Sequence, residues 1–271
     1  MFKRKIHVTR IKKNKKIQLE DEVLIEQSID IIVNNSPLVN IICLPKDLKE
    51  LAAGFLFTIG IIERAKDIKN INVNSLDNKI NIELNNSIEV NIDSIKMNPV
   101  SRVVDTTCGI SSPWRDMIKK SLEKDKELLK SKEEIKIDAD FIYSAIKKMQ
   151  IETILYRKTG GCHGAAIFNL LNEVESVKED IGRHNAIDKV IGDLLLRNVP
   201  FNNKILTTTG RLTGDSVLKA IKAHIPIMAS LSAGIESGIR LAFGYGLTLI
   251  GFVRGSRMNI YSHPERIYIS K

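Results

Sequence analysis

Cys108 lies in a segment of small polar residues, Asp-Thr-Thr-Cys-Gly-Ile-Ser-Ser, at positions 105–112. No apolar periodicity surrounds it, and Gly, Ser and Thr favour a loop in which a thiol is exposed and mobile. Such a thiol could carry sulfur: its thiolate attacks a donor persulfide, keeps the outer sulfur and brings it to an acceptor. Arg102 and Arg115 would favour the thiolate. The alternative is a small, half-buried cysteine without a chemical role.

Cys162 and His163 form a second candidate, in Thr-Gly-Gly-Cys-His-Gly at 159–164. The glycines would allow the backbone to approach a ligand closely. A Cys beside a His could provide a nucleophile and a base, or two metal ligands. However, adjacent residues of a strand point to opposite faces, so packing is the favoured interpretation of Cys162. The sequence has no CxxC or HxxxH spacing, which argues against zinc.

Three further segments could bind anions. Glu179 to Lys189 places Arg183, His184 and Asn185 at an expected helix start, and a helix N-terminus with Arg and His is suited to anions. A capped, solvated helix end is the alternative. Two Gly-Arg turns follow expected strands, and arginine grips phosphate through a bidentate fork. Each turn alone could hold a surface ion pair. Together they fit a large, multiply charged, guanine-bearing ligand, with candidates Arg211, Phe252, Val253, Arg254, Gly255, Ser256 and Arg257.

The elements that would position these residues alternate in the C-terminal half. Apolar residues between 187 and 195 mark a helical face. Three expected strands and two expected helices then follow, at 204–208, 216–224, 226–231, 235–245 and 247–254. This alternation argues for parallel pairing with helices packed on a sheet. Polar residues and glycines at the carboxyl ends of such strands indicate a ligand crevice.

The N-terminal half has a different pattern. We expect a strand and a turn over 23–37, a helix from Leu48 to Gly60, and an antiparallel meander over 71–92. The meander would turn at 77–78 and 85–86. A Lys/Glu-rich stretch at 119–134 reads as an exposed helix or linker and marks a domain boundary. The prediction is therefore a basic arm (1–22), an α+β domain with the Cys108 loop (23–130) and an α/β domain (131–271).

Composition narrows the function class. The chain has 271 residues, 43% hydrophobic and 27% charged, as in soluble globular proteins. Its apolar runs are too short for a bilayer, and the basic N-terminus lacks the apolar stretch of a secretory signal, so we expect no membrane partner. Three distant cysteines, Cys43, Cys108 and Cys162, imply no disulfide framework. A reducing, cytoplasmic location therefore fits best.

The net charge of +9 is concentrated at the N-terminus, where eight Lys or Arg lie between Lys3 and Lys16. The simplest interpretation is a solvated, partly mobile arm. The excess charge could otherwise serve a phosphate-rich ligand or an acidic partner. Aromatic residues make up only 5% and do not alternate with basic ones, so nucleic acid is not the expected partner.

Five segments in order resemble one known family. TTCGI, TGGCHGAAIF, EDIGRHNAIDKVIG, TTGRLTGDSV and LTLIGFVRGSRMNIY are similar to the FdhD family of formate dehydrogenase accessory sulfurtransferases. LAAGFLFTIGII resembles that family's early helix too. The resemblance covers about Pro37 to Ile260, nearly the whole chain.

The resemblance implies a cytidine deaminase-like mixed sheet with flanking helices, plus a smaller N-terminal α+β portion, in a homodimer. It implies partnership with a cysteine desulfurase and with the catalytic subunit of formate dehydrogenase. The ligand implied is the bis-molybdopterin guanine dinucleotide cofactor, for which GDP would be a mimic. By the same resemblance Cys108 would carry the persulfide, and the 252–257 segment would contact the cofactor. His184, Asn185 and Arg211 would support it.

The chain departs from the family at one place. Many members carry Cys-Gly-x-Cys-Gly, whereas this sequence has Cys108-Gly109-Ile110-Ser111-Ser112. This departure argues against a scheme that resolves through a second loop cysteine, although one sulfur suffices to hold a persulfide. The zinc-deaminase signature, H-x-E with P-C-x-x-C, is also missing, so the fold would be shared without the chemistry.

Two rivals to sulfur transfer remain at this point. A nonenzymatic chaperone would bind the guanine dinucleotide and transfer nothing, and the missing second cysteine favours it slightly. A basic nucleic-acid-binding protein would use the N-terminal arm. Sulfur loading, GDP binding and the salt dependence of oligonucleotide binding separate the three.

Overall fold

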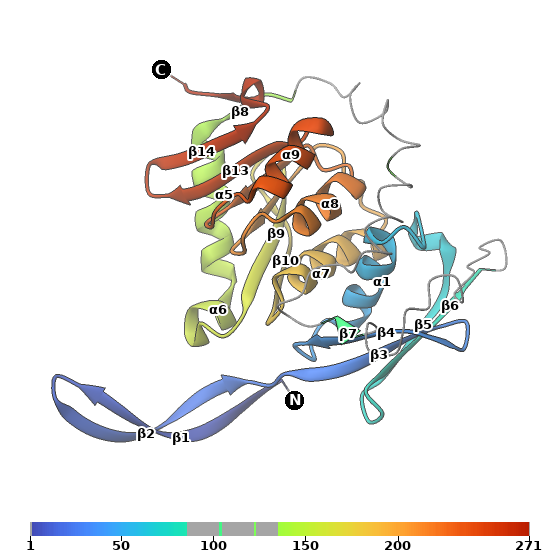
Figure 1. Cartoon of the computed structure of the whole chain (residues 1–271), viewed down its shortest axis with the longest axis vertical. Coiled ribbons are helices and arrows are strands. Elements are labelled where there is room, and N and C mark those ends of the chain that lie inside the picture. The colour runs from blue at the N-terminus through green and yellow to red at the C-terminus, as the bar shows by residue number, and fades with distance from the viewer. Residues whose placement is uncertain (1, 86–102, 105–121, 123–134, 271) are drawn as a thin grey trace.

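The computed structural model describes residues 2–85, 103–104, 122 and 135–270 (Figure 1). Its larger part is a six-stranded mixed sheet in the order β10-β9-β11-β12-β13-β14. The strands are β9 (His163–Asn169), β10 (Val174–Asp180), β11 (Lys204–Thr208), β12 (Ile227–Ser230), β13 (Thr248–Arg254) and β14 (Arg257–Ser262). β11, β12 and β13 are parallel, as predicted, and the other neighbours pair antiparallel.

Helices cover both faces of this sheet, which confirms the mixed α/β prediction; the cytidine deaminase-like assignment stays a prediction. α5 (Ala139–Glu152) covers one face, whereas α7 (Arg183–Leu196), α8 (Gly214–Lys222) and α9 (Glu236–Gly244) lie on the other. Neighbouring strand residues divide between the two layers because side chains alternate across a strand. Ile205 packs with the α5 cluster, and Leu206 packs with the α7 cluster.

A five-stranded sheet is built from the N-terminal half, in the order β5-β6-β3-β4-β7. Its strands are β3 (Gln27–Val33), β4 (Ser36–Cys43), β5 (Ile68–Asn74), β6 (Lys79–Leu84) and β7 (Val103–Val104). Asn34 and Asn35 adopt φ of 47° and 62°, which suits the tight turn between β3 and β4. β5 and β6 form the first part of the expected meander; the rest lies outside the described residues.

α1 (Leu48–Thr58) joins the two sheets, because it packs both on the N-terminal sheet and on α7 (Figure 1). One hydrophobic cluster runs from Ile29 and Ile80 through Leu51 to Ile187 and Leu206. The two predicted domains therefore share a core in the described part of the chain. The Lys/Glu-rich stretch proposed as their boundary, 119–134, is outside it apart from Leu122.

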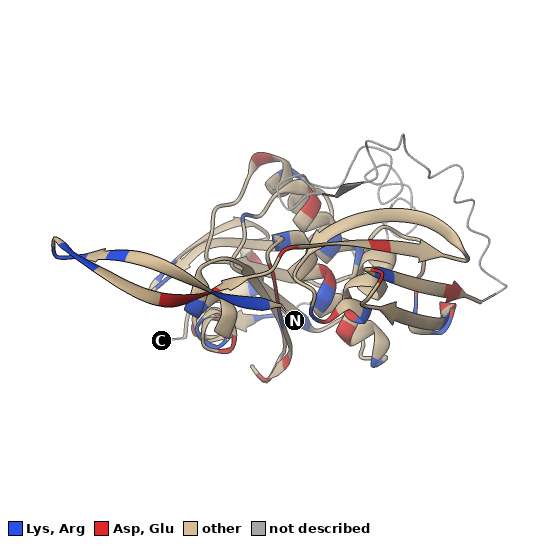
Figure 2. Cartoon of the chain, turned by 90° about the horizontal axis from the view of Figure 1, so that it is seen from below, with Lys and Arg blue, Asp and Glu red and all other residues tan. Residues whose placement is uncertain are grey.

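The segment predicted as a basic arm is an antiparallel ribbon of β1 (Lys3–Lys12) and β2 (Lys15–Leu24). Lys13 and Asn14 adopt positive φ and form its turn. The ribbon projects from the body, and Lys and Arg crowd its tip (Figures 1 and 2). The sequence did not predict these two strands, because the segment is rich in lysine and lysine is depleted in strands.

Short elements complete the described chain. They are α6 (Ile154–Thr159), the parallel pair β8 (Ile137–Asp138) and β15 (Ile267–Tyr268), and two 3-10 turns at Ala65–Asp67 and Pro264–Arg266. None of the helices in the described ranges is long and apolar enough to cross a membrane.

Candidate functional site

The carboxyl ends of β11, β12 and β13 meet at one edge of the sheet, as the parallel order requires. Hydrogen bonds tie the loops that follow them together. Ser230 Oγ donates to the Gly210 carbonyl at 2.6 Å, and Arg254 Nε donates to the Leu231 carbonyl at 3.3 Å. The Gly-Arg turns after β11 and β13 therefore lie at the same edge of the sheet, whereas the ligand crevice at this edge stays a prediction.

The first turn of α7 lies at the same edge. Gly182 is its N-cap, Arg183 and His184 follow, and the turn contains no acidic residue. Asp180 shapes the turn, since its Oδ1 accepts from Gly182 N at 2.8 Å and from Asn185 Nδ2 at 3.0 Å. Asn185 Nδ2 also donates to the Ile42 carbonyl at 2.9 Å. The Asn185 amide thus fixes the helix start and faces the core rather than an open ligand site.

The N-terminus of α8 joins that of α7 through His184. His184 Nδ1 lies 3.3 Å from Ser216 Oγ, and Ser216 Oγ lies 3.2 Å from Thr213 Oγ1. The N-termini of two helices therefore converge, and each contributes the positive end of a helix dipole. At the start of α8, Gly214 N donates to Ser237 Oγ at 3.2 Å, and Asp215 lies in the first turn. His184 is 6% exposed, and its Nε2 has no hydrogen-bond partner among the described residues. This ring nitrogen could form a hydrogen bond with a bound group.

Two arginines and a second histidine stand beside these helix ends. A Cβ on Gly210 would lie 2.8 Å from Arg183 Cβ, so only glycine lets the β11 turn, with Arg211, approach Arg183 this closely. His163 Nδ1 lies 3.1 Å from Thr209 Oγ1 on the same turn. Arg183 Nε is buried without a partner in the described chain. This group, Arg183, Arg211, His163 and His184, is the anion cluster.

Electrostatics in the anion cluster favour a negatively charged ligand. Burial lowers the pKa of Arg183, and the nearby Arg211 charge lowers it further, while Asp215 opposes the shift. Burial also lowers the pKa of His163, and Arg183 and Arg211 add to the effect, while Asp180 opposes it. Like charges held together at partly desolvated positions repel one another, and an anion would relieve the repulsion.

The 252–257 turn lies on the β13–β14 connection. Val253 is buried, whereas Arg254, Gly255, Ser256 and Arg257 are exposed, and Phe252 is partly buried at φ 53°. A register shift between Gly251 and Arg254 produces this bulge. Arg254 Nε donates to the Leu231 carbonyl, and Leu231 N donates to the Thr208 carbonyl at 3.2 Å. These two bonds link the 252–257 turn to the end of β11, which precedes Arg211.

Sequence reasoning left Arg183 and His163 out of the residues chosen for the ligand. The Gly-Arg-His order at a helix start was a usable signal for Arg183. His163 was a candidate only as a base or metal ligand beside Cys162, because nothing local shows that β9 pairs antiparallel with β11 and so brings His163 to Thr209.

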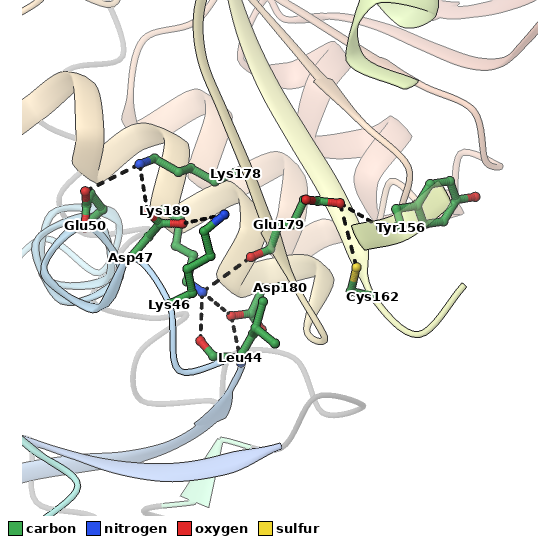
Figure 3. A network of polar contacts seen from close by, with 10 residues as sticks. All are labelled: Leu44, Lys46, Asp47, Glu50, Tyr156, Cys162, Lys178, Glu179, Asp180 and Lys189. Carbon is green, nitrogen blue, oxygen red and sulfur yellow. Dashed lines mark hydrogen bonds and ion pairs between the residues drawn. The ribbon is translucent and has the colours of Figure 1, made fainter. Parts of the chain in front are cut away.

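Two buried ion pairs hold α7 in place. Lys189 Nζ lies 2.6 Å from Asp180 Oδ2 and donates to the Leu44 carbonyl at 3.0 Å (Figure 3). Lys219 Nζ of α8 lies 2.6 Å from Asp188 Oδ1, and burial raises the pKa of that carboxyl despite the lysine. These pairs link α7 to the chain before α1 and to α8, so the helix N-terminus is rigidly placed.

Cys43 and Cys162 are both buried thiols with raised pKa values. Cys43 is 0% exposed, and burial raises the pKa of its thiol to about 12. Cys162 is 4% exposed, and burial, followed by the Glu179 carboxylate 4.0 Å away, raises its thiol pKa to about 12 (Figure 3). The packing interpretation of Cys162 fits this environment. Cys108 lies outside the described residues. Those residues contain no group of three metal-ligating side chains.

The fold is that of a mixed α/β protein, and the starts of α7 and α8 meet beside Arg183 and Arg211 at one edge of its larger sheet. The FdhD/NarQ family model matches residues 24–268, and the chain belongs to that family. Similar proteins named sulfur carrier protein FdhD occur in Sulfolobus acidocaldarius (37% identity, 97% of this chain, 98% of the relative) and Bacillus pumilus (34%, 91% and 90%). The crystal structure of a candidate formate dehydrogenase accessory protein from Desulfotalea psychrophila has a TM-score of 0.76 at 28% identity, covering 99% of this chain and all of that one.

Proposed function

We propose that this protein is a sulfur carrier for formate dehydrogenase, which takes sulfur from a cysteine desulfurase as a persulfide on Cys108. Family membership and the names of the relatives support a sulfur-carrier role. The assignment of Cys108 as the sulfur-carrying residue rests on the burial and raised thiol pKa of Cys43 and Cys162. Both thiols are buried, and burial raises the pKa of each to about 12, which disfavours the thiolate at neutral pH. Sulfur transfer needs a thiolate, and this leaves Cys108 as the carrier.

The loading step conserves electrons. The Cys108 thiolate attacks the outer sulfur of the donor persulfide, a new S–S bond forms, and the donor's cysteine leaves as a thiolate. Delivery reverses this pattern: the acceptor's electron pair takes the outer sulfur, and the S–S bonding pair stays on Cys108 as thiolate. A single cysteine completes the cycle, so Ser111 in place of a second cysteine is compatible with it.

The acceptor in this proposal is the bis-molybdopterin guanine dinucleotide cofactor, bound as a substrate. Its diphosphate would meet Arg183, Arg211 and the two helix N-termini, and the unpaired Arg183 Nε and His184 Nε2 fit such a group. The exposed 252–257 turn would contact the guanine end, and GDP would serve as a mimic. Asn185 would act by fixing the helix start. The sulfurated cofactor would then reach the catalytic subunit of formate dehydrogenase, with the carrier acting as a homodimer.

A sulfane-sulfur assay tests the loading step. The full chain is incubated with a cysteine desulfurase and cysteine, desalted and treated with cyanide, which converts sulfane sulfur to thiocyanate. We expect about one thiocyanate per chain for the wild type and for Cys162→Ala, and none above background for Cys108→Ala. Equal yields from the wild type and Cys108→Ala would refute the assignment.

GDP binding separates a carrier from a chaperone. A chaperone binds GDP without taking up sulfur, whereas the carrier does both, and Cys108→Ala should lose loading while its GDP affinity stays within about twofold, a difference of about 0.4 kcal/mol. Tight GDP binding by a wild-type chain that never loads sulfur would favour the chaperone.

A further inference from the structure

Both histidines of the anion cluster contact a hydroxyl group through the same ring nitrogen. His163 Nδ1 lies 3.1 Å from Thr209 Oγ1, and His184 Nδ1 lies 3.3 Å from Ser216 Oγ. The two imidazoles come from different elements, β9 and α7, yet the charge of Arg183 acts on the pKa of both. Both rings therefore lie near Arg183, and neither of these contacts uses the Nε2 atom of a ring.

The hydroxyl of Thr209 determines where the proton of the His163 ring lies. Gly164 N donates to Thr209 Oγ1 at 3.1 Å, so the hydroxyl oxygen is the acceptor in that bond. The hydroxyl proton of Thr209 is then available for a second bond, and His163 Nδ1 can accept it with its lone pair. A neutral imidazole that accepts at Nδ1 carries its own proton at Nε2. His163 therefore presents an Nε2–H donor.

A chain of two hydroxyl groups acts on His184 in the same way. Thr213 is the N-cap of α8, but its side chain makes no capping hydrogen bond, and its Oγ1 lies 3.2 Å from Ser216 Oγ instead. Hydroxyl groups rotate, so the chain can donate from Thr213 through Ser216 to His184 Nδ1. That direction puts the ring proton on Nε2, the buried nitrogen that has no hydrogen-bond partner among the described residues.

The position of the ring proton matters because both rings are mostly neutral at pH 7. Burial and the charge of Arg183 lower the pKa of His163 and of His184. A neutral imidazole has one donor and one acceptor nitrogen. An unprotonated Nε2 would turn its lone pair toward a phosphate oxygen and repel it. Only the Nε2–H form adds a hydrogen bond to those that Arg183 and Arg211 donate.

We propose that Thr209 and Ser216 are positioning residues, which hold His163 and His184 as neutral Nε2–H donors to the diphosphate of the bound guanine nucleotide. This inference rests on the proposed ligand and extends it to two residues that act through the histidines. The arginines of the cluster supply charge, whereas the ring N–H groups fix where individual phosphate oxygens lie. Loss of either hydroxyl frees the ring to adopt the other tautomer, which removes one donor from the site.

Nitrogen NMR of the full chain labelled with ¹⁵N-histidine reports the tautomers directly. The chain has five histidines, so His163→Asn and His184→Asn identify the two signals. In the GDP complex at pH 7.5 we expect a protonated Nε2 and an unprotonated Nδ1 for both rings. A protonated Nδ1 on either ring in that complex would overturn the proposal.

Calorimetric titration with GDP measures what the two hydroxyls contribute. Thr209→Val and Ser216→Ala should each weaken binding about 3- to 10-fold, which corresponds to the loss of one neutral hydrogen bond. Thr209→Ser keeps the hydroxyl and should bind GDP like the wild type. The matched control is Ser262→Ala, which removes a buried hydroxyl that donates to the Leu247 carbonyl at the opposite end of β13.

The outcomes separate this inference from the proposed ligand. Wild-type affinity in both Thr209→Val and Ser216→Ala would refute the positioning role while leaving GDP as the ligand. Weak binding by Thr209→Ser, equal to that of Thr209→Val, would also refute it, because the hydroxyl would then not be the group that matters. A wild type that does not bind GDP would refute the proposed ligand together with this inference. Circular dichroism confirms that each variant is folded.

Discussion

Gly54 of α1 and Gly192 of α7 lie against each other where the two helices cross. A Cβ on Gly54 would be 1.9 Å from the Asp188 carbonyl oxygen, and a Cβ on Gly192 would be 1.9 Å from the Glu50 carbonyl oxygen. The two backbones are therefore in direct contact. This crossing joins the N-terminal sheet to the helix whose first turn carries Arg183 and His184, so it fixes the anion cluster relative to the rest of the chain.

Gly54→Ala should destabilise the fold because the backbones must separate to admit a methyl group. We expect the free energy of unfolding to fall by about 3 kcal/mol, at the upper end for overpacking. Urea denaturation measures this. The matched control is Gly244→Ala near the end of α9, where a Cβ meets nothing within 4 Å and alanine should be neutral or slightly stabilising. Equal effects at the two positions would contradict the direct contact.

Lys219→Met should also be strongly destabilising, because it leaves the Asp188 carboxyl buried without its cation. Removing one partner of such a pair costs about 3–5 kcal/mol. The comparison is Lys5→Met, which breaks an exposed pair with Glu20 and should cost at most about 1 kcal/mol. If denaturation curves of Lys219→Met and the wild type coincide, the pair does not hold α7 to α8.

Arg183→Ala should weaken GDP binding by about 10- to 100-fold, because a charge-assisted hydrogen bond contributes about 1.5–3 kcal/mol. Isothermal titration calorimetry measures the affinity. Arg197→Ala provides the control on the same helix, since Arg197 pairs with Asp193 at the far end of α7 and should leave binding unchanged. An unaltered affinity in Arg183→Ala would place the diphosphate elsewhere.

Stability should fall in mildly acidic solution because of His184. Burial, Lys219 and Arg183 lower its pKa well below the ordinary 6.5. Below about pH 6.5 the imidazole of His184 binds a proton in the unfolded chain but not in the folded chain. The free energy of unfolding therefore decreases as pH falls toward the pKa of His184 in the folded state. Above pH 7 both states are neutral and the effect vanishes.

His184→Asn is the variant that tests this pH effect, and it should reduce the loss of stability between pH 7.5 and 5.5. His7→Asn, on the exposed ribbon, is the control and should not change that loss. Urea denaturation at the two pH values gives both quantities. The interpretation fails if His184→Asn shows the full wild-type pH dependence.

The fold of the C-terminal half was predictable because its signals are local. Apolar runs such as 204–208 and 247–254 mark buried strands, and the intervening helical faces force right-handed crossovers and parallel order. The anion cluster was predictable in part for the same reason, since Arg211 and His184 follow a strand end and a helix start. Approach of Gly210 to Arg183, by contrast, depends on long-range packing that no local pattern encodes.

The β1–β2 ribbon and the core shared by the two predicted domains could not be predicted from the sequence, for different reasons. β1 and β2 are rich in lysine, and their pairing depends on a Lys13-Asn14 turn at positive φ, a weak signal compared with Asn-Gly. The α1–α7 crossing joins residues more than a hundred positions apart. Within a helix, glycine lowers stability relative to alanine, so the sequence alone gives no reason for Gly54. The close crossing of α1 and α7 explains it, because the crossing leaves no room for a Cβ.

The most direct test of the central claim is the location of the added sulfur. Wild-type protein is loaded by a cysteine desulfurase, persulfides are alkylated, and tryptic peptides are analysed by mass spectrometry with and without reductant. The account predicts one additional sulfur atom on the peptide that contains Cys108, lost on reduction. Sulfur found on Cys43 or Cys162, with Cys108 unmodified, would contradict it.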